Sequence, residues 1–241
     1  MKTLQLTVMI ALCITGFPIF SFAACEEPPA PKVDWSGCTK KGSSLGKVIL
    51  SEANLAKADF QKATLEKALL VAANLSEANL TGANLQHAIL INAKLKGTNL
   101  QEANLSDAFL GGASLDNANL QGVHLERAFL GSTSLVQSDL SEALLFHSNL
   151  AMANLKKANL TGANFGNAIM PFADLSGANL EIANFENADL RGANFSGAYL
   201  YDTFFKGANL ENVTLTKAQY NSNTTWPEGF SPEDHGAKLI E

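Results

Sequence analysis

The run ANLSEANLTGANL, residues 73–85, repeats a five-residue pattern: a small residue, an asparagine, a leucine and two variable residues. Every fifth residue from Leu50 to Tyr220 is apolar or aromatic, and Leu occupies 28 of these 35 positions. Two residues before each stands a small side chain, which is Ala at 27 of the 34 positions from Ala53 to Ala218 and otherwise Thr, Ser or Val. One unit therefore repeats, without a break in register, through most of the chain.

A period of five residues fits neither an α-helix nor a flat strand. On a helix each step of five advances by about 140°, which spreads the leucines around the circumference, and on a strand an odd spacing alternates between faces. A backbone that turns a corner every five residues keeps each central leucine pointing inward. Successive coils of such a backbone stack as parallel ladders, so the sequence predicts a solenoid.

Two columns of similar residues indicate how many five-residue units form one coil. The central residue is Phe at three positions spaced by 20, namely Phe165, Phe185 and Phe205. The residue before the central one is apolar at the same spacing: Ile49, Leu69, Ile89, Phe109, Phe129 and Ile169. Four units per coil predict a four-sided cross-section. The 36 central positions from Leu45 to Tyr220 then give nine coils, a rod roughly 40 Å long at a strand spacing of about 4.8 Å.

The pattern resembles that of the pentapeptide-repeat family, Ala-(Asn/Asp)-Leu-x-x, as in Ala78-Asn79-Leu80 and Ala173-Asp174-Leu175. The resemblance covers about three quarters of the chain. It implies an all-β fold, the right-handed quadrilateral parallel β-helix, with the central Leu or Phe and the small residue inside. The segment Asp34-Trp35-Ser36-Gly37-Cys38 is similar to the entry segment of exported bacterial family members.

The N-terminal segment has the features of a secretory signal. Lys2 precedes an apolar stretch over residues 4–22, which ends in the small-x-small sequence Ser21-Phe22-Ala23. We therefore expect residues 1–23 to be a signal peptide and the mature chain to be exported, to a periplasm or beyond the cell. A retained membrane anchor is the alternative, but Thr, Gly and Pro interrupt the stretch.

The sequence predicts the remaining divisions as an N-terminal cap over 24–44, the β-helix over 45–220 and a C-terminal cap or tail over 221–241. Caps are expected because a solenoid leaves an open sheet edge at each end. Trp35 lies in the first segment, and Trp226 and Phe230 lie in the last. We expect these three aromatic residues to cover the exposed ends of the leucine ladder.

Two cysteines, Cys25 and Cys38, remain after the expected cleavage. In an oxidising compartment an even pair favours one disulfide. The alternative is a lipoprotein in which Cys25 carries the lipid, although Phe22 stands where such signals usually have Leu. A membrane is an expected partner only in that second case.

The charged residues suggest neither a nucleic-acid ligand nor a catalytic site. The chain has 17 basic and 23 acidic residues, a mild acidity that disfavours phosphate binding. An unbroken convex rod offers no cavity in which polar groups converge, so we expect no enzyme activity, metal, cofactor or small-molecule substrate. One polar column contains two of the four histidines and is interpreted as a solvated side of the rod: Lys67, His87, Asp107, Arg127 and His147.

One side of the predicted rod departs from this polar character. Its apolar or aromatic residues form the expected interaction face: Ile49, Leu69, Val71, Ile89, Ile91, Phe109, Phe129, Met152, Ile169 and Phe172. Exposed apolar patches of this kind usually bind another molecule. The function expected is an exported scaffold that uses this face for homodimerisation or for a protein partner. The alternatives are a DNA-mimicking inhibitor of a type II topoisomerase, which the signal and the interspersed lysines disfavour, and a carbohydrate-active β-helix enzyme.

Overall fold

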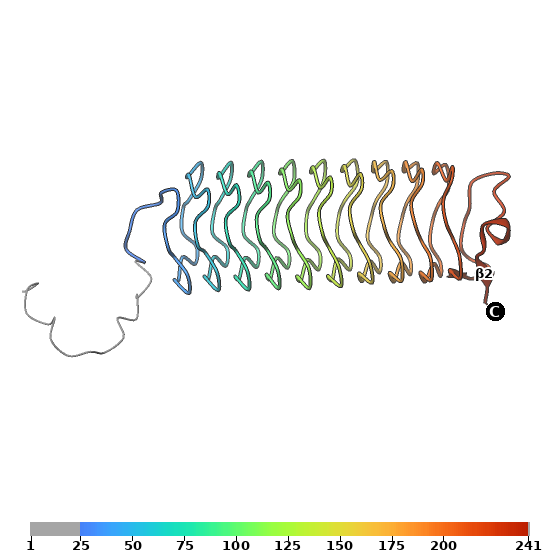
Figure 1. Ribbon diagram of the computed structural model, residues 1–241, viewed down its shortest axis with the longest axis horizontal. Coiled ribbons are helices and arrows are strands. Elements are labelled where there is room, and N and C mark those ends of the chain that lie inside the picture. Colours follow the sequence, from blue (N-terminus) through green and yellow to red (C-terminus); the bar gives the residue numbers. More distant parts are fainter. Residues whose placement is uncertain (1–24, 241) are drawn as a thin grey trace, which may run out of the picture.

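The computed structural model describes residues 25–240, which form a rod of stacked coils (Figure 1). The chain advances coil by coil from one end of the rod to the other, in sequence order. The architecture is the all-β, right-handed quadrilateral β-helix that the repeat predicts. The expected signal peptide, residues 1–23, lies outside the described residues.

Each side of a coil is too short to form a regular strand. One residue per side forms a parallel bridge with the residue 20 positions later, as Ile49 does with Leu69. This spacing confirms four five-residue units per coil. Among residues 25–240, regular elements occur only at the C-terminal end of the rod: β1 (Gln219–Tyr220), the short 3-10 helix η1 (Glu233–His235) and β2 (Lys238–Leu239), which pairs in parallel with β1.

The corners of the coils are tight turns. At one of them the Ala53 N–H donates to the Leu50 carbonyl oxygen at 3.1 Å, and Glu52, the third residue of the turn, has φ of 59°. A positive φ at this position is characteristic of a type II turn. The Leu50 and Glu52 N–H groups donate to the next coil, each at 2.8 Å. The backbone groups of the turn therefore hold successive coils together.

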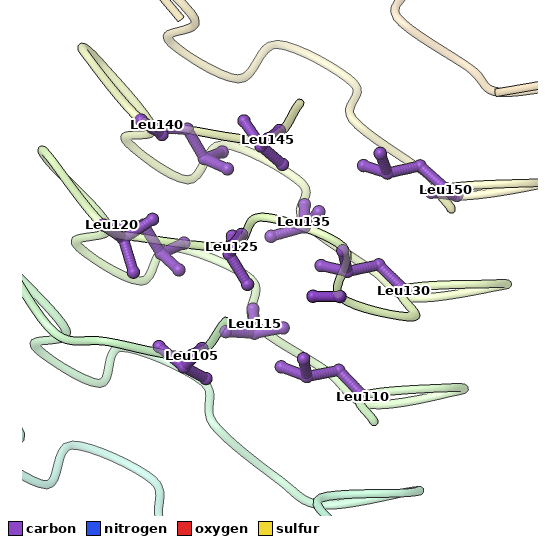
Figure 2. Close-up of a cluster of buried hydrophobic side chains, with 14 of the residues drawn as sticks. Leu105, Leu110, Leu115, Leu120, Leu125, Leu130, Leu135, Leu140, Leu145 and Leu150 are labelled. Atoms are coloured by element: carbon purple, nitrogen blue, oxygen red, sulfur yellow. The ribbon is translucent and has the colours of Figure 1, made fainter. Parts of the chain in front are cut away.

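The interior consists of two kinds of inward side chain. Central leucines from successive coils stack along the axis (Figure 2), and the small residues beside them are equally buried. Where Thr replaces Ala, its hydroxyl bonds the backbone: Thr98 Oγ1 donates to the Leu75 carbonyl oxygen at 2.8 Å. Each buried leucine contributes about 1.5–3 kcal/mol relative to exposure, and the narrow interior explains the small neighbour.

The coils begin before residue 45, the boundary that the sequence predicted. Asp34 already bridges Asn54, and Trp35 is buried in the inward column that leucines continue. Cys38 occupies a small-residue position and forms a disulfide with Cys25. The Lys40 ammonium lies 3.9 Å from the centre of the Trp35 ring and donates to the Cys25 carbonyl oxygen at 2.5 Å. The predicted cap is thus part of the first coil.

The inward pattern also continues past Tyr220, shifted by one residue. Thr225 bridges Phe204, 21 positions earlier rather than 20, and Thr224 donates to the Leu200 carbonyl oxygen from a small-residue position. Trp226 consequently stacks on Phe205, with ring centres 4.8 Å apart. The predicted end of the repeat at residue 220 is therefore too early, because a one-residue insertion hides the last inward aromatic residue.

Candidate functional site

The candidate site is one side of the rod, which we call the apolar face. Its outward column is linked coil to coil by parallel bridges. Its members are the outward residues Ile49, Leu69, Ile89, Phe109, Phe129 and Ile169 and the turn residues Val71, Ile91, Met152 and Phe172. The structure brings together along one side every residue that the sequence placed there. Because the backbone bridges set the positions of these residues, the face is ordered before any partner binds.

Two phenylalanines form the centre of the apolar face. The rings of Phe109 and Phe129 stack with centres 4.9 Å apart and planes within 1° of parallel. They remain 40% and 47% exposed, respectively. Aromatic side chains in fixed orientations supply much contact area at a small cost in conformational entropy, which suits them to binding.

Turn residues form the edge of the apolar face and protrude furthest. Met152 and Phe172 are 66% and 68% exposed, and both have a positive φ, 60° and 59°. Bulky residues adopt this conformation at a cost. The Phe172 ring lies over Gly192 in the next coil, where a Cβ atom would come within 2.6 Å of the ring. A glycine at position 192 therefore accommodates an exposed aromatic ring.

Polar residues interrupt and end the apolar face. Asn149 stands in the outward column between Phe129 and Ile169, and its Oδ1 accepts a hydrogen bond from the Ala151 N–H at 3.0 Å. Asp189 follows Ile169 in the same column and accepts two hydrogen bonds from Arg191, at 2.8 and 2.7 Å. These bonds hold the pKa of Asp189 below its usual value. The apolar face thus ends at an ion pair.

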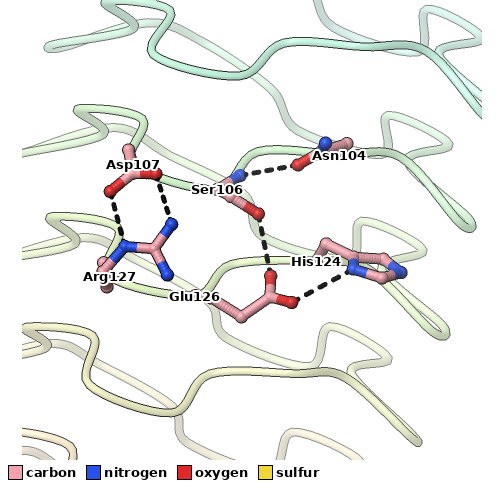
Figure 3. A network of polar contacts seen from close by, with 6 residues as sticks. All are labelled: Asn104, Ser106, Asp107, His124, Glu126 and Arg127. Atoms are coloured by element: carbon pink, nitrogen blue, oxygen red, sulfur yellow. Dashed lines mark hydrogen bonds and ion pairs between the residues drawn. The ribbon is translucent and has the colours of Figure 1, made fainter.

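The predicted polar column has a different arrangement of groups (Figure 3). Arg127 donates to both carboxylate oxygens of Asp107, at 2.9 and 2.6 Å, and this contact lowers the pKa of Asp107. Nearby, Glu126 accepts from the Ser106 hydroxyl at 2.9 Å and lies 3.2 Å from His124 Nδ1. These contacts run along the outer surface of the rod. They pair these charges locally.

The histidines and acids of the described coils show no metal-binding geometry. Within residues 25–240 no group of three or more His, Cys, Asp or Glu side chains is placed to hold a metal ion. His87 and His147 are exposed in separate coils of the polar column. The same part of the chain contains no helix long and apolar enough to cross a membrane.

A shallow pocket lies at the C-terminal end of a neighbouring side. It is lined by aromatic residues and by charges of both signs, including Glu186, Phe204, Lys206, Trp226 and Glu228. Near the same end of the rod, Tyr201 donates to Gln219 Oε1 at 2.6 Å, which ties its side chain to β1.

The three aromatic cap residues occupy the two ends of the rod. Trp35 is buried at the N-terminal end, and Trp226 stacks between Phe205 and Phe230, with ring centres 4.8 and 5.4 Å apart. Lys40, which was not predicted as a cap residue, contacts Trp35 and Cys25 at the N-terminal end from a central position. The five-residue register is the signal that could have found it, because Lys40 lies five residues before Leu45.

Comparison with known proteins reveals the same repeat. The family model for pentapeptide repeats matches eight copies, in overlapping segments that extend from residue 41 to residue 216. No curated protein matches the chain significantly. The solved structure of HetL, a pentapeptide repeat protein involved in heterocyst differentiation regulation from the cyanobacterium Nostoc sp. strain PCC 7120, is 32% identical, covering 83% of this chain and 90% of HetL, with a TM-score of 0.49.

Two further solved structures are more distant. A pentapeptide repeat protein from the thylakoid lumen of Arabidopsis thaliana is 27% identical over 43% of this chain and 68% of its own, with a TM-score of 0.30. QnrB1, a plasmid-mediated fluoroquinolone resistance protein, is 14% identical over 86% of this chain and 89% of its own, with a TM-score of 0.46.

Proposed function

This chain belongs to the pentapeptide-repeat family, and from that premise we propose that it is an exported, non-enzymatic interaction module whose apolar face binds a protein. The observation that carries the proposal is the stacked, exposed pair Phe109 and Phe129, at the centre of a bridged apolar column. A partner that covered this column would remove apolar surface from water without having to order the rod first.

The proposed location is the periplasm or the cell exterior, with the mature chain in soluble form. The signal-like segment 1–23 supports export, and the Cys25–Cys38 disulfide suits an oxidising compartment. A Cys25 sulfur bonded to Cys38 also has no free thiol to carry a lipid. Expression of the full chain in a Gram-negative host, followed by mass spectrometry of the mature N-terminus in the periplasmic and membrane fractions, tests this: a mature end at residue 24 in the periplasm supports it, and a lipid-modified end at residue 25 in the membrane fraction contradicts it.

The surface charges do not favour the alternative function, a DNA-mimicking inhibitor of a type II topoisomerase. Opposite charges alternate along the rod, as in the pairs Lys32–Glu52 at 3.4 Å and Lys57–Glu77 at 3.6 Å. A duplex mimic requires a continuous negative stripe. We therefore propose that the partner binds the apolar face rather than a charged surface.

The test compares the mature wild-type chain with the double variant Phe109→Lys/Phe129→Lys. Two lysines at the centre of the face would have to lose water on binding, so we expect association through the face to weaken at least tenfold, about 1.4 kcal/mol. Size exclusion with light scattering measures self-association, and crosslinking in the periplasm measures contact with other proteins. Circular dichroism and thermal unfolding should show the same folded rod.

The matched control is Gln101→Lys/Gln121→Lys. These residues also lie one coil apart, on the opposite side of the rod, with side chains 3.4 Å from each other. The same charge change should leave association unaffected there. Association that persists in the phenylalanine variant, or that falls equally in the control, would rule out the apolar face as the binding surface.

A further inference from the structure

We infer that the occupant of the apolar face is a second copy of this chain, packed antiparallel, with Phe109 against the partner's Phe129. This inference rests on the proposed function, since it names the partner of the same surface. It is carried by the geometry of the coils, by the sizes of the turn residues that would face each other and by the charges at the two ends of the face.

Regular coils allow two rods to pack in reverse order. Each bridge advances by 20 residues and about 4.8 Å. A two-fold axis that crosses the face at right angles to the rod therefore pairs each column with itself, reversed. With the axis midway between Phe109 and Phe129, the stacked rings of one rod cover those of the other. Leu69 then faces the partner's Ile169, so the column is covered toward both of its ends.

Large turn residues face small ones in this arrangement. The protruding Phe172 lies opposite the partner's Ala72, and Ile91 lies opposite the partner's Ala151. Glycines face each other at the central turns, where Gly111 meets the partner's Gly131. In the antiparallel order these protruding turn residues therefore face smaller residues of the partner.

The antiparallel order also brings coils that carry opposite charges together at the two ends of the face. Glu52, paired with Lys32, lies near the N-terminal end, and Arg191, paired with Asp189, lies near the C-terminal end. The coil of Glu52 faces the coil of the partner's Arg191, and the coil of Lys32 faces that of the partner's Glu211. A parallel pair, related by a two-fold axis along the rod, would place the same coil of each rod side by side, so Arg191 and the partner's Glu52 would lie about seven coils apart.

The area of the apolar face sets the affinity that we expect for the dimer. From Ile49 to Asp189 the column spans eight coils, about 34 Å at the strand spacing, and one side of the coil is roughly 12 Å wide, giving about 400 Å² of flat area. That is below the roughly 800 Å² per partner of a standard interface. Asn149 faces the partner's Ile89 with its oxygen already bonded to the Ala151 N–H. We therefore expect a dimer with a dissociation constant in the micromolar range.

Single cysteines distinguish the two directions of packing. The cysteines of the mature chain, Cys25 and Cys38, form the disulfide, so an added cysteine has no other thiol to pair with. Leu69→Cys and Ile169→Cys proteins, carrying tags of different mass, are oxidised separately and as a mixture. Antiparallel packing predicts disulfide-linked dimers of mixed composition only. In separate samples the two introduced thiols, one from each copy of the same variant, would lie about five coils apart, roughly 24 Å.

A matched cysteine pair on the opposite side serves as the control. Gln61→Cys and Glu181→Cys lie in the same two regions along the rod and should not crosslink, alone or mixed. Crosslinks from Leu69→Cys alone would overturn the antiparallel order in favour of a parallel pair. The same experiment includes light scattering of wild type up to about 500 μM, well above a micromolar dissociation constant.

The outcomes separate this inference from the proposed function. A wild-type monomer at the highest concentration would overturn the second-copy inference, while periplasmic crosslinks to a foreign protein that Phe109→Lys/Phe129→Lys abolishes would leave the proposed function standing. A dimer that forms equally well with the Phe109→Lys/Phe129→Lys variant would overturn both the second-copy inference and the proposed role of the apolar face. A lysine-sensitive dimer with mixed cysteine crosslinks supports both.

Discussion

Single residues in the repeat each meet one geometric requirement of the corner. The small residue fits the narrow interior, the central Leu fills it, and the Asn between them bonds the turn: Asn99 Oδ1 accepts from the Gln101 N–H at 3.1 Å. These three positions are visible in the sequence because few side chains satisfy them. The third turn residue is different, since it needs a positive φ but points to solvent. Glycine recurs there, as at Gly82, Gly97 and Gly162, but many other residue types tolerate the position at a cost, so the sequence marks it less clearly than the inward positions.

We predict that Gln137→Gly stabilises the rod by about 0.5–1 kcal/mol. Gln137 is exposed, with φ of 57°. Glycine removes a left-handed strain of about 1–2 kcal/mol. Glycine also makes the unfolded chain more flexible, which lowers the stability by about 0.4–1 kcal/mol and offsets part of the gain. Urea unfolding of the mature chain measures the difference as a higher midpoint at constant slope.

The adjacent turn residue is the control for this prediction. Val136 does not have a positive φ, so Val136→Gly has no strain to remove and should lower the midpoint. Equal destabilisation by both substitutions would show that the third turn position carries no strain in this fold.

The cap elements show where prediction from the sequence stopped. The repeat predicted the coils between residues 45 and 220 because a uniform side chain marks each corner. At the N-terminal end the inward positions hold Trp35, Cys38 and Lys40, whose types differ because no further coil covers them. At the C-terminal end one inserted residue shifts Trp226 out of the five-residue count. The two ends of the rod therefore follow the same backbone path as the coils, but the five-residue repeat does not specify their side chains.

The C-terminal cap should lose stability at alkaline pH through Tyr220. Its hydroxyl donates to a Glu233 carboxylate oxygen of η1. Burial, and then this bond, raise the pKa of Tyr220 from 10.0 to about 12. Since the folded-state pKa is the higher one, the contribution is complete below about pH 10 and is lost as the pH rises toward 12. We predict that wild type loses more stability over this interval than Tyr220→Phe.

Urea unfolding at about pH 9 and at about pH 11.5, two values that span most of this interval, measures the loss of stability. Tyr199→Phe is the matched control, because Tyr199 is 43% exposed in an outward column of the coils. That variant should retain the wild-type alkaline loss. An identical loss in Tyr220→Phe would show that the phenol contributes nothing to the pH dependence of the cap.

At the scale of the whole molecule, the number of units per coil places each residue on a side. The sequence predicted the apolar face from this count, and the structure aligns its columns by bridges of 20 residues. The degree of exposure was not predictable in the same way. Leu69 and Ile89 are only partly exposed, whereas the larger Phe109 and Phe129 remain at least 40% exposed. Ile169, which lies between Asn149 and Asp189, is 46% exposed, so the neighbours of a residue in its column set its exposure, and a count of residues does not describe them.

The same count predicts that the length of a deletion, more than its content, decides whether the apolar face survives. Deleting residues 131–150 removes one full coil and leaves Ile169 and Phe172 in line with Phe129. Deleting residues 131–140 removes half a coil, which moves Ile169 and Phe172 to the opposite side and divides the face. Both chains keep the five-residue register, so circular dichroism should show two folded rods. By light scattering, the full-coil deletion should still associate, more weakly for the loss of one coil, while the half-coil deletion should be a monomer. Equal association of both chains would mean that the interface does not depend on a continuous apolar face.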